Sequence, residues 1–338
     1  MGADNGAGNG ELDILGIGNA IVDVISNATD EVILSHGLPK GSMTLIDAER
    51  ADALYVAIGP SMEISGGGGA NTIAGAASFG AEVAFIGKVR DDTLGDTFTS
   101  DIRAAGAVFR TPPLSQGPAT ARCLIMVSPD GQRTMSTYLG AAVELGPEDI
   151  DTDLVGRAKV TYLEGYLWDP PRAKEAFRTA MAAAHARDRK VALSLSDTFC
   201  VERHREEFRA LVENDVDILF ANEEEVRELY QVATLDQALA AVRGRCEIVA
   251  VTRSEKGSLV SSGGSFHEVS AEAIDTLVDT TGAGDSYAAG FLYGLTHGLD
   301  LPTCARLGSI AAAEIISHVG ARPQVNLAEL AAPVLAAR

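Results

Sequence analysis

The stretch Asp279-Thr280-Thr281-Gly282-Ala283-Gly284-Asp285 follows a strand-like segment and precedes an apolar, alanine-rich segment, residues 286–296, that has the composition of a buried helix. Two glycines in a turn that opens a helix allow the backbone to close tightly. We therefore expect the amides of Gly282, Ala283 and Gly284 to point outward at the positive end of the helix dipole. The turn predicts an anion site.

A carboxylate directly follows these glycines. An isolated aspartate in the first turn of a helix usually caps the helix or offsets its dipole. Beside an anion site, Asp285 has a second use. A carboxylate can take the proton from an attacking hydroxyl while backbone amides stabilise charge on a moving phosphoryl group. We interpret Asp285 as a candidate general base for phosphoryl transfer.

Apolar, strand-like runs alternate along the chain with segments rich in Ala, Leu, Arg and Glu. Strands are expected at residues 12–17, 83–86, 160–163, 191–195, 218–220 and 248–251, and helices at residues 172–186 and 223–230. Strands connected by helical crossovers form parallel sheets. The sequence therefore predicts an α/β fold with a doubly wound, mostly parallel sheet and helices on both faces.

Two segments, residues 19–47 and 111–140, interrupt this alternation with β-branched residues and turn signals and show no convincing helix. In the second segment, Asp130-Gly131 lies between two strand-like runs and is a strong hairpin signal. We expect both segments to form a small β-sheet lid that stands off the main domain. Residues 1–11 have the composition of a flexible tail, so residues 12–338 would form a single domain with a discontinuous lid.

Composition restricts the partners and the compartment. Asp and Glu number 47 against 27 Lys and Arg, and the resulting net charge of −20 opposes binding to nucleic acids or anionic membranes. No signal peptide and no apolar run of roughly 18 residues is visible, so a cytoplasmic protein is expected. The 4 cysteines and 6 histidines lack metal-ligand spacing, which predicts reduced thiols and no zinc site.

Three motifs, in order, resemble a known family. Residues 279–290 resemble the C-terminal signature of the PfkB carbohydrate and nucleoside kinases. Gly66-Gly67-Gly68-Gly69-Ala70-Asn71, together with residues 85–89 and 92–95, resembles the N-terminal signature, and Asn222-Glu223-Glu224-Glu225 resembles the family's NxxE motif. The chain is identified on these motifs as a member of the ribokinase (PfkB) superfamily, which implies a ribokinase-like fold and an ATP-dependent kinase.

The resemblance also implies roles for individual residues. Asp285 is similar to the catalytic base, and Gly282, Ala283 and Gly284 are similar to the anion hole. Asn222 and Glu225 resemble the pair that organises Mg²⁺, largely through water. The implied ATP-binding residues are Asn222, Thr252, Gly257, Gly282, Gly284 and Gly320, with residues 252–257 and 312–320 on the adenine side. A monovalent cation such as K⁺ is a further implied cofactor.

For the acceptor, Gly66, Gly67 and Asn71 resemble the loop that grips a sugar, and Asn19 and Asp23 lie in a segment similar to the base of the lid. A carboxylate such as that of Asp23 has the right acceptor geometry for two vicinal hydroxyls. The apolar groups that could sandwich a purine are Met43, Leu45, Leu124, Met135, Leu139 and Tyr166. Arg133 matches a lid arginine that could close over the transferred phosphate.

Residues 216–223 and 18–23 look closer to adenosine kinases than to ribokinases, so we expect phosphorylation of the 5′-hydroxyl of adenosine. Ala121, Val143 and Ser194 depart from residues common in the family, which weakens the assignment of the acceptor but not of the chemistry. The alternatives are a kinase for ribose, fructose or a related sugar, an inosine or guanosine kinase, and a non-catalytic nucleotide sensor. The sequence leaves open a monomer or a homodimer, since a lid can cover its own site or pair with a partner's lid.

Overall fold

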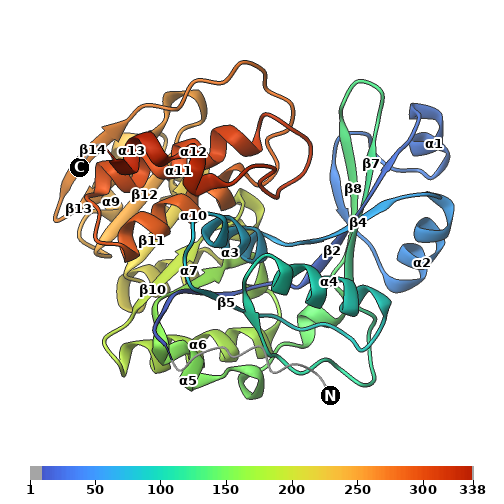
Figure 1. Cartoon of the computed structure of the whole chain (residues 1–338), viewed down its shortest axis with the longest axis horizontal. Helices are drawn as coiled ribbons and strands as arrows, with labels where there is room; N and C mark the ends of the chain where they lie inside the picture. Colours follow the sequence, from blue (N-terminus) through green and yellow to red (C-terminus); the bar gives the residue numbers. More distant parts are fainter. Residues whose placement is uncertain (1–9, 337–338) are drawn as a thin grey trace.

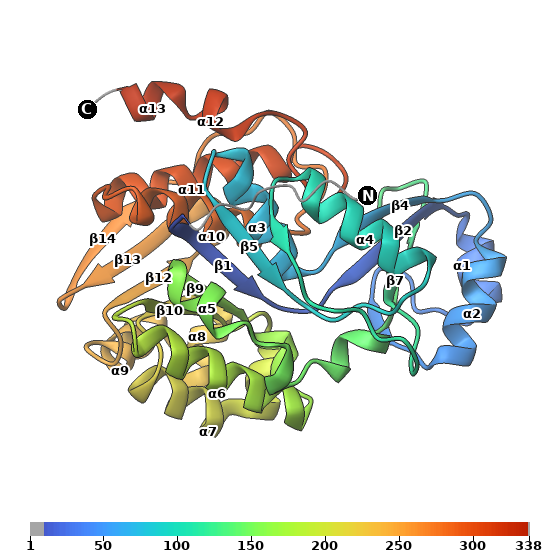
Figure 2. The ribbon, with the colours of Figure 1, turned by 60° about the horizontal axis from the view of Figure 1, so that its bottom comes forward.

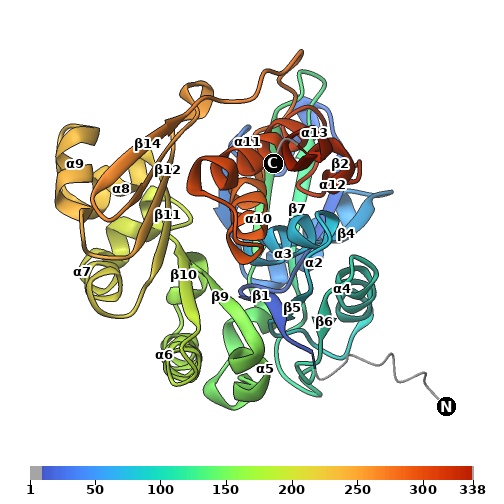
Figure 3. The ribbon, with the colours of Figure 1, turned by 60° about the vertical axis from the view of Figure 1, so that its left-hand side comes forward.

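The computed structural model describes residues 10–336 and arranges them around two β-sheets of unequal size (Figure 1). The larger sheet has nine strands in the order β14-β13-β12-β11-β10-β9-β1-β5-β6, which Figure 3 shows fanning across the molecule. Its strands are β1 (Leu12–Ile17), β5 (Val83–Ile86), β6 (Val108–Phe109), β9 (Ala158–Glu164), β10 (Lys190–Ser194), β11 (Ile218–Asn222), β12 (Ile248–Thr252), β13 (Ser258–Ser262) and β14 (Ser265–Val269).

Neighbouring strands from β6 through β12 are all parallel, and β13 and β14 continue the sheet as an antiparallel hairpin. The predicted strands are all present, and the predicted mostly parallel sheet is confirmed. Burial explains why the sequence predicts these strands. β1 and β5 are buried along their whole length, and a strand covered on both faces has a continuous apolar sequence.

Helices cover both faces of this sheet, as predicted (Figure 2). Alternate residues of one strand serve the two layers, so that Ile14 packs in one core cluster and Leu15 in the other. The helices of the first layer are α3 (Gly68–Ser78), α4 (Thr93–Ala104), α10 (Ala283–Thr296) and α11 (Leu301–Ile315). Those of the second are α5 (Thr152–Arg157), α6 (Pro171–His185), α7 (Thr198–Asn214), α8 (Glu223–Tyr230) and α9 (Leu235–Val242).

The smaller sheet forms the lid and lies beside the main sheet in Figure 1. Its strand order is β3-β8-β7-β2-β4, with β2 (Ile21–Asn27), β3 (Met43–Leu45), β4 (Met62–Gly66), β7 (Ala121–Val127) and β8 (Arg133–Tyr138). β7 and β8 pair antiparallel around Asp130-Gly131, which confirms the hairpin. The prediction missed β4, a third segment of chain that joins this sheet.

Two local expectations were wrong. A short helix, α1 (Asp30–Ser35), interrupts the first lid segment, because Thr29 caps it by accepting from the amide of Val32 and two acidic residues occupy its first turn. A second helix, α2 (Ala48–Ala57), follows β3 just beyond the segment for which no helix was expected. No strand precedes the glycine turn of residues 279–285, since residues 270–282 have no helix or strand and apolar side chains there, such as Leu277, are exposed.

After β14 the described chain adds no further strand to either sheet. Two short helices, α12 (Leu327–Leu330) and α13 (Ala332–Ala336), close the described part and lie over α11 (Figure 3). Most of the predicted flexible tail, residues 1–9, lies outside the described residues. None of the helices within residues 10–336 is long and apolar enough to cross a membrane.

The order of the strands identifies the place for a ligand. From β1 the chain adds β5 and β6 on one side of the main sheet, and then β9 to β12 on the other. The connections therefore reverse direction between β1 and β9, and open α/β sheets bind ligands at the carboxyl ends of the strands at such a point. Gly18 and Asn19 follow β1 there, and Glu164 ends β9.

Candidate active site

Asp285 lies in the first turn of α10. There it contacts residues 65–71, at the end of β4 and the start of α3, which we call the acceptor loop. Asn71 Nδ2 donates to Asp285 Oδ2 at 3.1 Å, and Thr72 Oγ1 donates to the Asp285 carbonyl oxygen at 3.2 Å. Removal from water raises the pKa of Asp285 to about 6, against the opposing effects of the Asn71 hydrogen bond and the Arg322 charge. The carboxylate is therefore mostly ionised at neutral pH and oriented by an amide, as a general base requires.

The glycine turn before Asp285 is formed differently from the prediction. Gly282 has φ +78°, and a Cβ atom on it would lie 2.7 Å from the Cβ of Ala321, so only glycine fits. The amide of Ala283 donates to the carbonyl of Thr280 at 3.2 Å, so this amide does not point outward as expected. The amides of Gly282 and Gly284 make no hydrogen bond to any residue between 10 and 336, which leaves them available for an anion.

The acceptor loop runs from the end of the lid strand β4 into the first turn of α3. A Cβ on Gly66 would lie 2.5 Å from Asp23 Oδ2, and Gly67 has φ +94° with its Cβ position 2.3 Å from the Asn19 carbonyl. Both positions therefore require glycine, and the structure brings Asn19, Asp23, Gly66 and Gly67 together. The helix α3 begins at Gly68, so Gly68 and Gly69 form part of its first turn.

Asp23 presents an open carboxylate to this loop. Within the described chain it accepts no hydrogen bond, and burial raises its pKa to about 6 although Arg133 and Arg322 act in the opposite direction. A carboxylate without a protein donor in a partly buried site is stabilised when a ligand supplies hydroxyl donors. The geometry therefore fits the diol contact predicted for Asp23.

Glu164 is a residue of this site that the sequence did not reveal. Its Oε2 accepts from the amide of Asn19 at 2.6 Å and its Oε1 from the amide of Gly68 at 3.1 Å, and the side chain is buried. Burial raises its pKa to about 7, while these amides lower it. Glu164 thus fixes the loop after β1 to the acceptor loop. The only sequence signal was an acidic residue at the end of an apolar strand.

Strand alternation decides which apolar lid residues face the site. Met43 lies opposite Met135 and Leu45 opposite Thr137, on the face that also carries Asp23. Leu124 lies on the other face, where it packs in a core cluster with Ile33 and Leu54, so its expected role in a purine slot is wrong. A hollow of about 320 Å³ is lined by Leu45, Ile46, Pro118, Thr137, Tyr138, Leu139, Gly140, Val143 and Glu144.

Arg133 pairs with a protein carboxylate in this structure. Its guanidinium forms an ion pair with Asp279, the first residue of the glycine turn, and both side chains are buried. Asp279 also accepts from the amides of Thr281 at 3.0 Å and Gly320 at 3.2 Å. The lid hairpin is therefore tied to the turn. Arg133 would have to leave Asp279 to reach a transferred phosphate.

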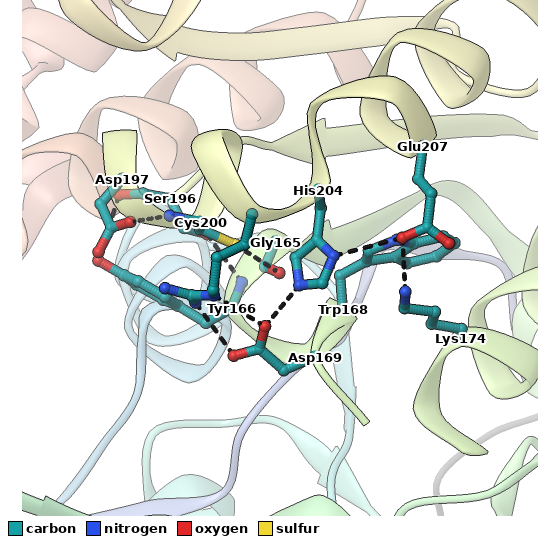
Figure 4. Close-up of polar contacts among 11 residues, drawn as sticks. Gly165, Tyr166, Trp168, Asp169, Lys174, Ser196, Asp197, Cys200, His204 and Glu207 are labelled. Atoms are coloured by element: carbon teal, nitrogen blue, oxygen red, sulfur yellow. Dashed lines mark hydrogen bonds and ion pairs between the residues drawn. The ribbon is translucent and has the colours of Figure 1, made fainter. Parts of the chain in front are cut away.

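Tyr166 follows β9 of the main sheet and does not belong to the lid. Its amide donates to Ser196 Oγ at 3.2 Å, and its hydroxyl donates to the Ser196 carbonyl at 3.3 Å. Burial and the charges of Asp197 and Asp285 raise the pKa of Tyr166. Figure 4 shows a cluster of charged side chains beside Tyr166. There Asp169 contacts Arg203 and His204, and Glu207 contacts His204, Lys174 and Trp168.

The NxxE motif caps α8. Asn222 Oδ1 accepts from the amide of Glu225 at 2.8 Å, and the Glu225 carboxylate accepts from Asn222 N at 2.9 Å and Asn222 Nδ2 at 2.7 Å. Each side chain is thus already bound by the other, although carboxylate oxygens retain lone pairs for water. In the described part of the chain, no group of three or more His, Cys, Asp or Glu could hold a metal ion. The pair suits a hydrated cation better than a directly bound one.

The predicted ATP residues lie at the same end of the sheet. Thr252 is the register partner of Asn222 on the neighbouring strand, and the amide of Gly320 contacts the turn through Asp279. A Cβ on Gly257 would lie 2.0 Å from the Val269 carbonyl, and this residue has φ +81°. Packing between β13 and the chain after β14 therefore accounts for Gly257 being glycine.

Comparison with known proteins agrees with this geometry. The model of the pfkB family of carbohydrate kinases matches residues 41–327. The crystal structure of adenosine kinase from Sinorhizobium meliloti has 52% identity and a TM-score of 0.89, over 96% of this chain and 99% of that one. A probable sugar kinase from Rhizobium etli CFN 42 has 49% identity and a TM-score of 0.89, over 96% and 98%.

A curated relative extends the similarity to eukaryotes. The adenosine kinase of Saccharomyces cerevisiae (strain ATCC 204508 / S288c) is 29% identical over 329 residues, which cover 90% of this chain and 94% of the yeast protein. The family match spans well over half of the chain and includes the acceptor loop, the NxxE motif and the glycine turn with Asp285. The chain therefore belongs to the pfkB family of carbohydrate kinases and is an ATP-dependent kinase.

Proposed function

We propose that this kinase transfers the γ-phosphoryl group of ATP to the 5′-hydroxyl of adenosine. The observation that carries the proposal is the position of Asp285, which is bound by Asn71 of the acceptor loop and lies directly after a turn with two free amides. Similarity to the adenosine kinases of S. meliloti and yeast supports adenosine as the acceptor.

The residues of the site divide the chemistry among them. Asp285 removes the proton of the 5′-hydroxyl as the hydroxyl attacks, and Asn71 keeps the carboxylate oriented. The amides of Gly282 and Gly284 stabilise the charge of the phosphoryl group during transfer. Asp23 accepts hydrogen bonds from the 2′- and 3′-hydroxyls, and the apolar lid face at Leu45 supplies a surface for the base.

Asn222 and Glu225 would hold a hydrated Mg²⁺, because their oxygens can accept from its water shell without leaving each other. A bound divalent cation would neutralise charge on the phosphates of ATP. Thr252 and Gly320 would lie on the nucleotide side of the same cleft. A requirement for a monovalent cation such as K⁺ stays a prediction of the family resemblance.

A sugar kinase is the second candidate. The probable sugar kinase of R. etli is nearly as similar to this chain as the S. meliloti adenosine kinase. The carboxylate of Asp23 would bind the diol of a free sugar as well as that of a ribonucleoside. The apolar lid face is what favours a nucleoside over a free sugar. Met43 and Leu45 are 48% and 55% exposed, so a purine base could bury apolar area that a sugar would leave exposed.

A panel of acceptors tests the proposal. Purified protein with MgATP is offered adenosine, inosine, guanosine, ribose, fructose and 2-keto-3-deoxygluconate, and ADP release is measured. Burial of a purine against the lid should give adenosine a kcat/KM at least about a hundredfold above that of ribose or fructose. This ratio requires that roughly 2.7 kcal/mol of the binding free energy of the base is retained in the transition state.

Each other outcome of the panel has a defined meaning. A preference for a free sugar would overturn the nucleoside assignment and leave the kinase chemistry intact. A preference for inosine or guanosine would indicate that polar groups near Thr137 or Ser194 contact the purine edge. ATP binding without turnover of any acceptor would favour the nucleotide sensor.

A further inference from the structure

Arg322 makes three hydrogen bonds to the acceptor loop, although it comes from the other end of the chain. Its Nε donates to the Ser65 carbonyl at 3.0 Å, its Nη2 to Ser65 Oγ at 3.0 Å, and its Nη1 to the Ala70 carbonyl at 2.7 Å. Ser65 and Ala70 flank the glycines of the acceptor loop. The guanidinium thus binds both ends of the loop that carries Gly66 and Gly67.

The residues next to Arg322 contact the glycine turn. The amide of Gly320 donates to Asp279 Oδ2 at 3.2 Å, and Ala321 lies so close to Gly282 that a Cβ on this glycine would be 2.7 Å from the Ala321 Cβ. Gln324 fixes the other end of the segment, because its amide donates to Glu314 Oε1 of α11 at 2.9 Å. Residues 320–322 therefore connect the acceptor loop to the turn that leads to Asp285.

Arg322 also lies among the acidic groups of the site. Its charge lowers the pKa values of Asp23 and Asp285 against the effect of burial. Burial lowers the pKa of Arg322 itself to about 10, so the guanidinium stays protonated at neutral pH. Asp101 is a further carboxylate of this cluster, since its Oδ2 accepts from the amide of Ser65 at 2.9 Å and its charge acts to raise the pKa of Arg322.

We propose that Arg322 is a positioning residue for phosphoryl transfer, which sets the acceptor loop against the turn of Asp285 so that a bound acceptor meets the base. The inference rests on the proposed function, in that the acceptor is taken to bind Asp23 and Asn71. An arginine suits this task because its planar fork directs several donors at once, whereas lysine places a single flexible charge. Ala321 and Gly320 then transmit the position of the loop to the turn.

The test compares Arg322→Met, which removes the charge and the hydrogen bonds, with Arg322→Lys, which keeps the charge. Arg172→Met is the matched control, because Arg172 pairs with Glu148 at the surface. In Arg322→Met the acceptor KM should rise about tenfold or more while the ATP KM changes less than about twofold, because the lost hydrogen bonds lie on the acceptor side. Arg322→Lys should show a similar rise.

The pH profile of kcat/KM is the second readout. The acid limb should shift to higher pH in Arg322→Met, because Asp285 and Asp23 lose a stabilising charge, and Arg322→Lys should restore it. A purely structural role for Arg322 would leave the limb in place. The proposal is overturned if the limb does not move, or if the KM values of acceptor and ATP rise equally.

These measurements use whichever acceptor the wild-type protein prefers. If that acceptor is a sugar, the adenosine assignment is contradicted, but the role of Arg322 is still tested. If no acceptor is converted, hydrogen exchange replaces kinetics. Arg322→Met should then speed amide exchange in residues 65–71 relative to Arg172→Met, with the strands of the main sheet unchanged. Equal exchange in the two variants would contradict the proposal.

Discussion

Asp285→Asn is expected to lower kcat by roughly 10²–10⁴-fold with little change in nucleotide binding, which is the usual contribution of a positioned general base. Asparagine keeps the shape of the side chain but cannot accept the proton of the attacking hydroxyl. Steady-state kinetics with MgATP and the preferred acceptor measure kcat, and calorimetry measures ATP binding. A variant that keeps more than about a tenth of wild-type kcat would show that Asp285 is not the base.

Thermal unfolding provides the control for this variant. The pKa of Asp285 is raised in the folded protein from 3.8 to about 6, so its charge opposes folding above that range and the stability that it contributes is lost as pH rises from about 4 to 6. Asp285→Asn removes this charge. The variant should therefore be at least as stable as the wild type at pH 7, and its loss of activity would not reflect unfolding.

Asp23→Ala should raise the acceptor KM by roughly 10²-fold or more, because two sugar hydroxyls lose their partner in a closed site at about 1–3 kcal/mol each. The structure supports a strong effect, since Asp23 lies over Gly66 and accepts no hydrogen bond from the rest of the described chain. The ATP KM should stay close to that of the wild type. Steady-state kinetics with varied acceptor and varied ATP separate the two.

A 2′-deoxy acceptor completes a double-mutant cycle for Asp23. The wild type should lose affinity for the deoxy compound, whereas Asp23→Ala should lose little more, because the contact is already absent. If the losses from the variant and from the deoxy acceptor add, Asp23 does not contact that hydroxyl. Asp101→Ala is a useful comparison, because the Asp101 carboxylate accepts from the amide of Ser65 and is not expected to contact the sugar hydroxyls.

The sequence predicted those parts of the fold that depend on local pattern. Strands buried on both faces, such as β1, read as apolar runs, and the Asp130-Gly131 hairpin carries its own turn chemistry. The helix α1 escaped notice because its six residues, Asp30–Ser35, are too short for a clear helical period, and only the cap at Thr29 marks it. The strand β4 was missed because its five residues, Met62–Gly66, include an acidic residue and end in the glycine run, so no buried apolar run marks it.

In the candidate site too, residues in local motifs could be predicted, and residues that depend on tertiary contacts could not. Asp285, Asp23 and Asn71 could be proposed from the sequence because each stands in a motif with a chemical reason for its residue type. Glu164 and Arg322 have no such motif, and their importance comes from contacts with residues 145 and 257 positions away in the chain. Leu124 was assigned to the wrong face because the register of β7 against β2, which decides the face, depends on tertiary pairing.

Transfer of label from [γ-³²P]ATP to adenosine tests the central claim most directly. Wild-type protein with Mg²⁺ should produce labelled AMP with the phosphate on the 5′-oxygen, and Asp285→Asn should produce it at least about a hundredfold more slowly. The position of the label distinguishes 5′-phosphorylation from transfer to the ribose diol that Asp23 is expected to bind. Label on the 2′- or 3′-oxygen, or labelled 5′-AMP formed equally fast by the variant, would contradict the account.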